Sequence, residues 1–234
     1  MTDTGSRPAN RRGKAAAPAP SDDGRANAAR PTASVKWWAL MSGVTGVVAN
    51  VFLLLFYVTV KPWDEAPGPF GWFGRANDTL VVVQYLALVP VILGLERLMS
   101  DDVRARAWTR VGLAACIAII VLQVLLLAWV LSFDIQIVPV GLSVIATVCW
   151  AGAISSAGSR TSTLPRSVTR LGRFLAVALP VGAAVFAIGF LVALVSDLSW
   201  AWVAGGLPGF AIWFLFPVWT LLLAVAPARA GRPH

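Results

Sequence analysis

The residues of this chain that are best placed to do chemistry are uncharged polar side chains inside long apolar runs. Asn50 follows Ser42 and Gly46 at a spacing of four residues, which places all three on one face of a helix. Similar side chains occur at depth in later runs, and the full set is Asn50, Gln84, Gln123, Ser143 and Thr147. Small and polar residues at this spacing favour close helix packing. The alternative is that the five side chains converge on a polar cavity.

Charged side chains are nearly absent from the apolar runs, so acid–base chemistry within them has few candidates. Glu96 and Arg97 stand together near the end of one run, while Asp134 and Asp197 stand at the ends of others. An ionisable group within a membrane span is a candidate functional residue. We therefore name Glu96 with Arg97 as a candidate site at the inner face. The alternative is a structural ion pair between Glu96 and an arginine of a nearby loop.

Several classes of catalytic and metal site lack the residues that they need. The single histidine is His234, which excludes helix-borne haem sites and hydrolytic sites that depend on an internal histidine. Cys116 and Cys149 form no Cys-x-x-Cys motif and suit buried thiols. We therefore expect no catalytic residue, no cofactor and no metal ligand, and a protein that is not an enzyme.

The chain that must position these residues is unusually apolar. Of its 234 residues 58% are hydrophobic and 13% are charged, whereas about half and about a quarter are typical of soluble domains. The apolar residues gather in runs of about 20 residues, the length of a helix that crosses a bilayer. We predict an all-α integral membrane bundle over residues 36–226. Its six transmembrane helices are predicted at 37–60, 79–98, 111–133, 135–155, 174–195 and 201–226.

The two ends of the chain differ in composition from the spans. Residues 1–35 are rich in Ala, Pro and Arg and hold no apolar run, which predicts a disordered tail. The formal net charge is +8, and of the 19 basic residues only Lys61 and Arg75 fall on the side opposite the termini. The positive-inside rule then predicts that the tails 1–35 and 227–234 are both cytoplasmic. We expect a bacterial plasma membrane, anionic lipid headgroups at the inner arginine clusters, and no nucleic acid partner.

Local patterns also predict where two helices begin. Ser100–Asp101–Asp102 is typical of a helix N-terminus, so we expect the third helix to start about ten residues before it enters lipid. Thr163 is predicted to cap the fifth helix, with Pro165 in the first turn. From Leu164 to Arg173, apolar residues and arginines take opposite helix faces. This pattern predicts an amphipathic segment at the membrane interface that leads into the fifth span.

Two further features concern loops and breaks. We expect Asp134 to lie between the third and fourth spans, in a tight hairpin. The segment Gly205–Gly209, which includes Pro208, is the strongest helix-breaking pattern in any span. Because Gly and Pro are common in membrane helices, we favour ordinary helix composition over a break there.

Two fragments carry a resemblance to a known group of proteins. Asn77–Asp78 opens the second span and leads into Gln84-Tyr85-Leu86-Ala87-Leu88-Val89-Pro90-Val91. Leu164-Pro165-Arg166, followed by Arg170-Leu171-Gly172, precedes the fifth span. With the six-span layout, these fragments resemble a domain-of-unknown-function family, the uncharacterised six-helix integral membrane proteins of actinobacteria. The resemblance implies the fold and implies no activity.

The lack of buried charge and of a catalytic set leads to a hypothesis about function. We expect a non-enzymatic accessory, sensor or scaffold protein that works with a protein partner or as a homo-oligomer. The alternative is a small transporter or permease for a neutral or amphipathic substrate, which the prolines within spans and the Asn/Gln set favour. A third, less favoured hypothesis is a lipid-modifying enzyme that uses Glu96 with Arg97 or Arg104 at the inner face.

Overall fold

Six long α-helices make up nearly all of the described structure. The computed structural model describes residues 31–59, 71–99, 102–196, 198 and 200–226. The helices are α2 (Ala33–Thr59), α3 (Trp72–Leu98), α4 (Val103–Leu127), α5 (Phe133–Arg160), α6 (Arg166–Ser196) and α7 (Trp200–Ala224). Each holds a stretch long and apolar enough to cross a membrane, and the described residues include no strand. The predicted all-α fold with six helices able to span a membrane is confirmed. Of the predicted disordered tail 1–35, residues 1–30 lie outside the described residues, as does the tail 227–234. Helix α2 begins at Ala33, so the last three residues of the predicted tail 1–35 are helical instead of disordered.

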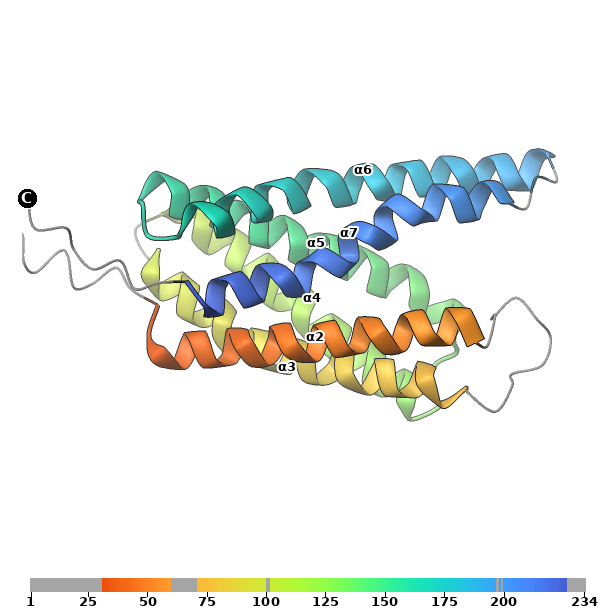
Figure 1. Ribbon diagram of the computed structural model, residues 1–234, viewed down its shortest axis with the longest axis horizontal. Coiled ribbons are helices and arrows are strands. Elements are labelled where there is room, and N and C mark those ends of the chain that lie inside the picture. The colour runs from red at the N-terminus through yellow and green to blue at the C-terminus, as the bar shows by residue number, and fades with distance from the viewer. Residues whose placement is uncertain (1–30, 60–70, 100–101, 197, 199, 227–234) are drawn as a thin grey trace, which may run out of the picture.

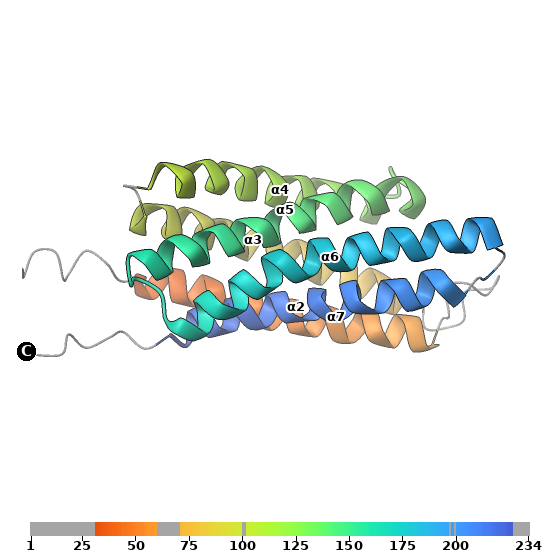
Figure 2. The ribbon, with the colours of Figure 1, turned by 90° about the horizontal axis from the view of Figure 1, so that it is seen from above.

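The helices pack in chain order and close into a ring. Each of α3 to α7 contacts the helix before it, and α7 returns to α2 (Figures 1 and 2). The ring begins and ends on the same side, where the Lys36 ammonium donates a 2.7 Å hydrogen bond to the carbonyl oxygen of Ala226. We call this side the terminal end. The opposite side, which holds Thr59, Trp72, Leu127 and Phe133, is the distal end.

Helix α4 begins where the sequence predicts, and the reason is a side-chain cap. The Asp102 carboxylate accepts hydrogen bonds from the backbone N–H groups of Arg104, at 2.9 Å, and Ala105, at 3.1 Å. These N–H groups have no partner within the helix, so an aspartate at this position stabilises the first turn. The early start of the third helix, before it reaches the predicted span, is thereby confirmed. Ser100 and Asp101, the other residues of the predicted N-terminus, lie outside the described residues.

The predicted start of the fifth helix is wrong by a few residues. Helix α6 begins at Arg166, and the Thr163 hydroxyl lies 2.9 Å from the hydroxyl of Thr161 instead of capping the helix. The first carbonyl to accept a helical hydrogen bond is that of Pro165, from the N–H of Thr169. Proline fixes its own φ and fits a helix entrance, so the helix starts after it. From Arg166 onward the predicted amphipathic segment is helical, and it runs without interruption into the apolar part of α6.

The predicted boundary at Asp134 is also wrong. Helix α4 ends at Leu127 and α5 begins at Phe133, so the connection is residues 128–132 and Asp134 lies in the first turn of α5. Trp129 has a positive φ of 61°, a conformation that ends a right-handed helix. A carboxylate in the first turn is favoured by the positive end of the helix dipole, which suits Asp134. Helix α3 likewise starts earlier than predicted, at Trp72 instead of Thr79, and so contains Asn77 and Asp78.

Helix α7 is continuous through Gly205–Gly209, as the interpretation of ordinary helix composition predicts. The glycines there allow α6 and α7 to approach until their backbones nearly touch. A Cβ added to Gly182 of α6 would lie 2.9 Å from the Cα of Gly209, and one added to Gly205 would lie 3.0 Å from the carbonyl oxygen of Val185. Close approach of backbones is the main source of attraction between helices in lipid, where burial of apolar side chains supplies little.

Tryptophans fill the centre of the bundle toward the terminal end. The rings of Trp150 on α5 and Trp219 on α7 meet edge to face at 5.8 Å, and both side chains are fully buried. The Trp219 indole N–H lies 3.2 Å from both the Ser155 hydroxyl and the carbonyl oxygen of Val168. This side chain therefore links α5, α6 and α7 by packing and by hydrogen bonds. Gly112 on α4 leaves the space that Trp150 occupies.

The close contact between α6 and α7 generates a prediction. Gly182→Leu must separate the two backbones, so we expect it to lower the free energy of unfolding by roughly 1–3 kcal/mol, as overpacking commonly does. Gly141→Leu on α5 is the matched control, because a Cβ there meets nothing within 4 Å. The measurement is thermal unfolding in mild detergent. Equal melting temperatures for the two variants would contradict the close contact.

Candidate functional site

The five polar residues predicted to share a cavity separate into two groups in the structure. Gln123 on α4 accepts a 2.8 Å hydrogen bond from the side-chain amide of Gln136 on α5. The Ser143 hydroxyl bonds to the carbonyl oxygen of Pro139, and the Thr147 hydroxyl bonds to that of Ser143. These three side chains are thus satisfied by α4 and α5, and none of them bonds to Asn50 or Gln84. The geometry assigns Gln123, Ser143 and Thr147 to helix packing.

Asn50 and Gln84 are the other group, and they lie where α2 meets α3. Each side chain is 5% exposed, and neither makes a hydrogen bond to any residue that the structure describes. The Gln84 amide lies against Gly46 of α2 and Pro217 of α7, since a Cβ on Gly46 would come within 2.7 Å of both. The structure therefore keeps this pair as a candidate polar site within the membrane-spanning part of the bundle.

Gln136 is a buried polar residue that the sequence analysis left out. It is 2% exposed and completes the hydrogen bond with Gln123. The side chain lies in the same apolar run as Ser143, so its residue type alone marks it for consideration. That Gln136 and not Gln84 faces Gln123 depends on the tight connection between α4 and α5, which sets the register of these helices.

The candidate site at the inner face, Glu96 with Arg97, stays a prediction. Glu96 is half-buried and Arg97 is exposed, both at the terminal end of α3. The ion pair that the described residues form at this end joins Asp102, the cap of α4, to Arg160 of α5, with 2.6 Å between nitrogen and oxygen. This hydrogen bond from Arg160, with those from the backbone of Ala105 and Arg104, lowers the pKa of the Asp102 carboxyl.

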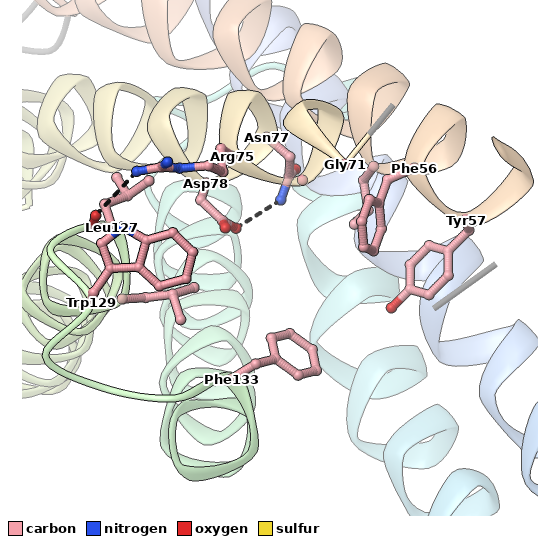
Figure 3. A pocket seen from close by; sticks show the side chains of 12 residues that line it. Phe56, Tyr57, Gly71, Arg75, Asn77, Asp78, Leu127, Trp129 and Phe133 are labelled. Atoms are coloured by element: carbon pink, nitrogen blue, oxygen red, sulfur yellow. Dashed lines mark hydrogen bonds between the residues drawn. The ribbon is translucent and has the colours of Figure 1, made fainter. Parts of the chain in front are cut away.

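A cavity of about 320 Å³ opens at the distal end, between α2, α3 and the connection from α4 to α5. Its size suits a small organic ligand, for which pockets of roughly 300–1,000 Å³ are typical. Figure 3 shows the side chains around it. Its lining residues are mostly aromatic or aliphatic, and they are Leu53, Phe56, Tyr57, Gly71, Gly74, Arg75, Asn77, Asp78, Leu126, Leu127, Trp129 and Phe133.

The two charged residues of this cavity point apart. The Arg75 guanidinium lies 5.0 Å from the centre of the Trp129 ring and donates a long, 3.5 Å hydrogen bond to the carbonyl oxygen of Leu127. Asp78 points the other way, and its carboxylate accepts a 3.2 Å hydrogen bond from the amide of Asn77 (Figure 3). Arg75 thus forms a cation–π contact in one wall of the cavity. The Asp78 carboxylate has one neutral partner and keeps acceptor capacity toward the cavity.

Sequence patterns did not predict this site. Asn77 and Asp78 entered only through the resemblance, as the opening of the second span, and Tyr57 and Trp129 fall within the predicted spans 37–60 and 111–133. The available signal was that the stretch from Trp72 onward can form a helix. Such a helix moves Asp78 from a loop onto a helix. The contribution of Trp129 had no sequence signal, since it depends on the turn that carries this residue back toward α3.

Comparison with protein-family models, with curated proteins and with solved structures finds no match to this chain. The resemblance to six-helix membrane proteins of actinobacteria therefore stays a prediction. Among the described residues, no three His, Cys, Asp or Glu side chains come together in a group that could hold a metal ion. The candidate site consequently rests on the geometry of the distal cavity.

The pairing of Gln123 with Gln136 generates a second prediction. Gln136→Leu leaves the buried Gln123 amide without its partner, so we expect a loss of roughly 1–3 kcal/mol in the free energy of unfolding. The double variant Gln123→Leu/Gln136→Leu removes both amides, and we expect it to regain most of that loss. Gln84→Leu, which removes an amide without a partner among the described side chains and so leaves no second buried amide unpaired, is expected to cost less than Gln136→Leu. Denaturation in mixed detergent micelles measures all three, and a double variant no more stable than Gln136→Leu would contradict the pairing.

The ion pair at the terminal end generates a third prediction, on pH. Because the folded pKa of Asp102 is lowered, its contribution to stability is present above the ordinary aspartate pKa of about 3.9 and is lost as the pH falls through the lower folded value. Asparagine keeps a good cap but loses the charge. We expect the melting temperature of wild type to exceed that of Asp102→Asn at pH 6. The difference between the two melting temperatures is expected to vanish toward strong acid.

The control for this pH prediction is the same comparison made with Arg160→Gln in both proteins, which removes the main cause of the lowered pKa. The difference between aspartate and asparagine at position 102 is then expected to shrink at every pH. A difference that grows as the pH falls would contradict the assignment.

Proposed function

We propose that this chain is a non-enzymatic multi-pass membrane protein that binds an amphipathic ammonium compound in the distal cavity, in a sensor or accessory role. The observation that carries the proposal is the Asp78 carboxylate, which is half-buried in the cavity wall and, among the described residues, is hydrogen-bonded only to a neutral amide. A carboxylate in partly apolar surroundings favours a cationic partner more strongly than one in bulk water does. Arg75 does not supply that charge, because its guanidinium is directed to Leu127 and Trp129.

The aromatic residues around Asp78 support the choice of an ammonium ligand. Phe56, Tyr57, Trp129 and Phe133 line the cavity, and the faces of such rings attract quaternary and primary ammonium groups. The aliphatic lining, from Leu53, Leu126 and Leu127, suits an apolar body attached to the charged group. A carboxylate, aromatic rings and aliphatic walls together favour an amphipathic cation over an anion or a sugar.

The cavity offers little for catalysis. Among the lining residues that the structure describes there is no Ser, Thr, Cys, His or Lys, and Asp78 and Tyr57 are the side chains there that could carry a proton or act as a nucleophile. Binding without chemical conversion is therefore the function that these residues support best. This is the basis for proposing a non-enzymatic protein in preference to the lipid-modifying enzyme that uses Glu96.

In the proposed orientation the cavity opens at the outer face of the membrane. Basic residues cluster on the side of the two termini, and the positive-inside rule favours that side as cytoplasmic in a bacterial plasma membrane. The anionic headgroups of the inner leaflet then lie near a group of arginines, which are Arg104, Arg106, Arg110, Arg160, Arg166, Arg170 and Arg173. With this orientation a ligand reaches Asp78 from the external medium or from the outer leaflet.

A second candidate function, a small permease for a neutral or amphipathic substrate, is favoured by a different observation. Asn50 and Gln84 are buried amides without hydrogen-bond partners in the described structure, at a depth where a passing substrate would meet them. A permease moves its ligand across the bilayer, whereas a sensor only binds it. Uptake into proteoliposomes separates the two functions.

The test of the proposed site compares binding of hexyltrimethylammonium to wild-type protein and to Asp78→Asn in lipid nanodiscs. Loss of the charge is expected to weaken binding about tenfold or more, since opposite unit charges about 5 Å apart attract by roughly 3 kcal/mol at an effective dielectric constant of about 20. Asp134→Asn is the matched control. This aspartate also lies at the distal end but is exposed and does not line the cavity.

Calorimetry with the uncharged analogue 2,2-dimethyloctane, which replaces the nitrogen by carbon, separates charge recognition from apolar partition. We expect the analogue to distinguish neither variant from wild type. Equal ammonium affinity in wild type and Asp78→Asn, or an equal loss in Asp134→Asn, would overturn the proposed site.

A further inference from the structure

Three glycine contacts fix the register between α2 and α3. Gly74 on α3 lies against Phe56, Gly46 on α2 lies against Gln84, and Gly94 on α3 lies against Val35. The helices are antiparallel, so each step toward the terminal end lowers the residue number on α2 and raises it on α3 by the same amount (Figure 1). The register places Leu53 level with Asn77, Asn50 with Leu80, and Ser42 with Leu88.

This register arranges four polar side chains in one column. From the distal end inward the order is Asn77, Asn50, Gln84 and Ser42, and successive levels are three or four residues apart, or about 5–6 Å. Their exposed fractions are 8%, 5%, 5% and 0%. On α2 the residues Ser42, Gly46 and Asn50 follow a spacing of four and share one face. We call Asn77, Asn50, Gln84 and Ser42 the polar column.

The polar column starts at the distal cavity. Asn77 and its neighbour in level, Leu53, both line that cavity. The distance along α2 from the level of Leu53 to that of Ser42 is eleven residues, or about 16 Å. This is roughly half of a hydrocarbon core of about 30 Å. The column therefore extends from the level of the cavity toward the middle of the bundle.

The inner three members of the polar column lack hydrogen-bond partners among the described residues. The Ser42 hydroxyl is completely buried and makes no hydrogen bond. The side-chain amides of Asn50 and Gln84 make none to the described residues, and each of these side chains keeps 5% of its surface exposed. The other buried Ser, Thr and Gln side chains of the described structure all have partners. Outside the column, the buried side-chain atom without a partner is the indole nitrogen of Trp150. A concentration of unpartnered groups on one seam calls for a ligand that satisfies them.

Helix α7 adds an acceptor beside the column. Pro217 contacts Gly46 and so lies next to the Gln84 amide. Proline has no N–H, so the carbonyl of Trp213, four residues earlier, loses its helical donor. The column itself offers amide and hydroxyl donors together with amide and hydroxyl acceptors, and no charge. Such a set matches small uncharged molecules that both donate and accept hydrogen bonds, with water as the smallest.

We propose that the distal cavity continues along the polar column as a hydrated passage that reaches Ser42. The occupants are water molecules and small uncharged ligands with hydroxyl or amide groups, which bridge Asn50, Gln84 and Ser42. The 5% exposure of Asn50 and of Gln84 fits contact with such occupants. This inference goes beyond ammonium binding at Asp78, because it concerns a different ligand class and does not depend on that charge.

Cysteine accessibility tests the passage in the full chain. In a background with Cys116→Ala and Cys149→Ala, single cysteines replace Asn50, Gln84 or Ser42, and methyl methanethiosulfonate labels the protein in proteoliposomes. Controls at matched depth replace Val51, Val83 or Val44, neighbours whose side chains are exposed on the outer surface of the bundle. The thiolate is the reactive form and needs water, so we expect column positions to react about tenfold faster than their controls.

The order of the labelling rates is a second result expected from the same experiment. Labelling is expected to slow from Asn50 to Gln84 to Ser42, because the passage opens only at the distal end. Rates at Asn50 and Gln84 no faster than at Val51 and Val83 would overturn the proposal. Adding Asp78→Asn is expected to leave the rates unchanged, so loss of ammonium binding and absence of the passage are distinguishable.

A measurement on the unsubstituted protein covers the case in which the cysteine variants do not fold. Hydroxyl radicals generated from bound water oxidise the side chains beside it. Leu88, level with Ser42, and Leu175 on α6 are both fully buried, so they form a matched pair. We expect Leu88 to be oxidised faster than Leu175, and equal rates would overturn the proposal.

Discussion

Buried polar groups in a membrane bundle have no bulk water as an alternative partner, and this constraint governs how the six helices meet. Where partners exist, the helices are fixed to one another. The Trp219 indole bonds to both Ser155 and the carbonyl of Val168, and Gln136 bonds to Gln123. Elsewhere the attraction comes from close backbone approach, as between Gly182 and Gly209.

The two ends of the bundle use this constraint differently. At the terminal end, three charged side chains, Lys36, Asp102 and Arg160, hold helix ends together. Lys36 reaches the carbonyl of Ala226, and Asp102 both caps α4 and binds Arg160. These contacts join the first helix to the last and α4 to α5. At the distal end, the short connection from α4 to α5 carries Trp129 back toward α3, and a cavity remains between the aromatic side chains.

The distal cavity and the polar column complement each other chemically. The cavity presents one carboxylate among aromatic rings, which suits a cation with an apolar body. The column presents only uncharged amides and a hydroxyl, which suit small neutral molecules. Gly43 and Gly46 let α7 approach α2 closely beside the column. The seam between α2, α3 and α7 is thus the part of the bundle where tight packing and unsatisfied polar groups coincide.

Run lengths and composition in the sequence determined the six-helix fold, because hydrocarbon thickness dictates the length of a span and lipid leaves the backbone no choice but a helix. Asp102 at the start of α4 was also predictable, since helix capping is a local interaction. The early start of α3 and the connection at residues 128–132 were missed, because apolar composition marks the hydrocarbon core and does not mark helix ends.

Tertiary structure alone decided which polar residues find partners. Asn50, Gln84 and Gln123 look alike in the sequence, yet Gln123 meets Gln136 while Asn50 and Gln84 remain unpartnered. The difference depends on the rotation of each helix about its axis and on its register with its neighbour, and glycine contacts such as Gly46 with Gln84 set both. For the same reason no local pattern predicted the distal cavity, whose walls come from α2, α3 and the turn at Trp129.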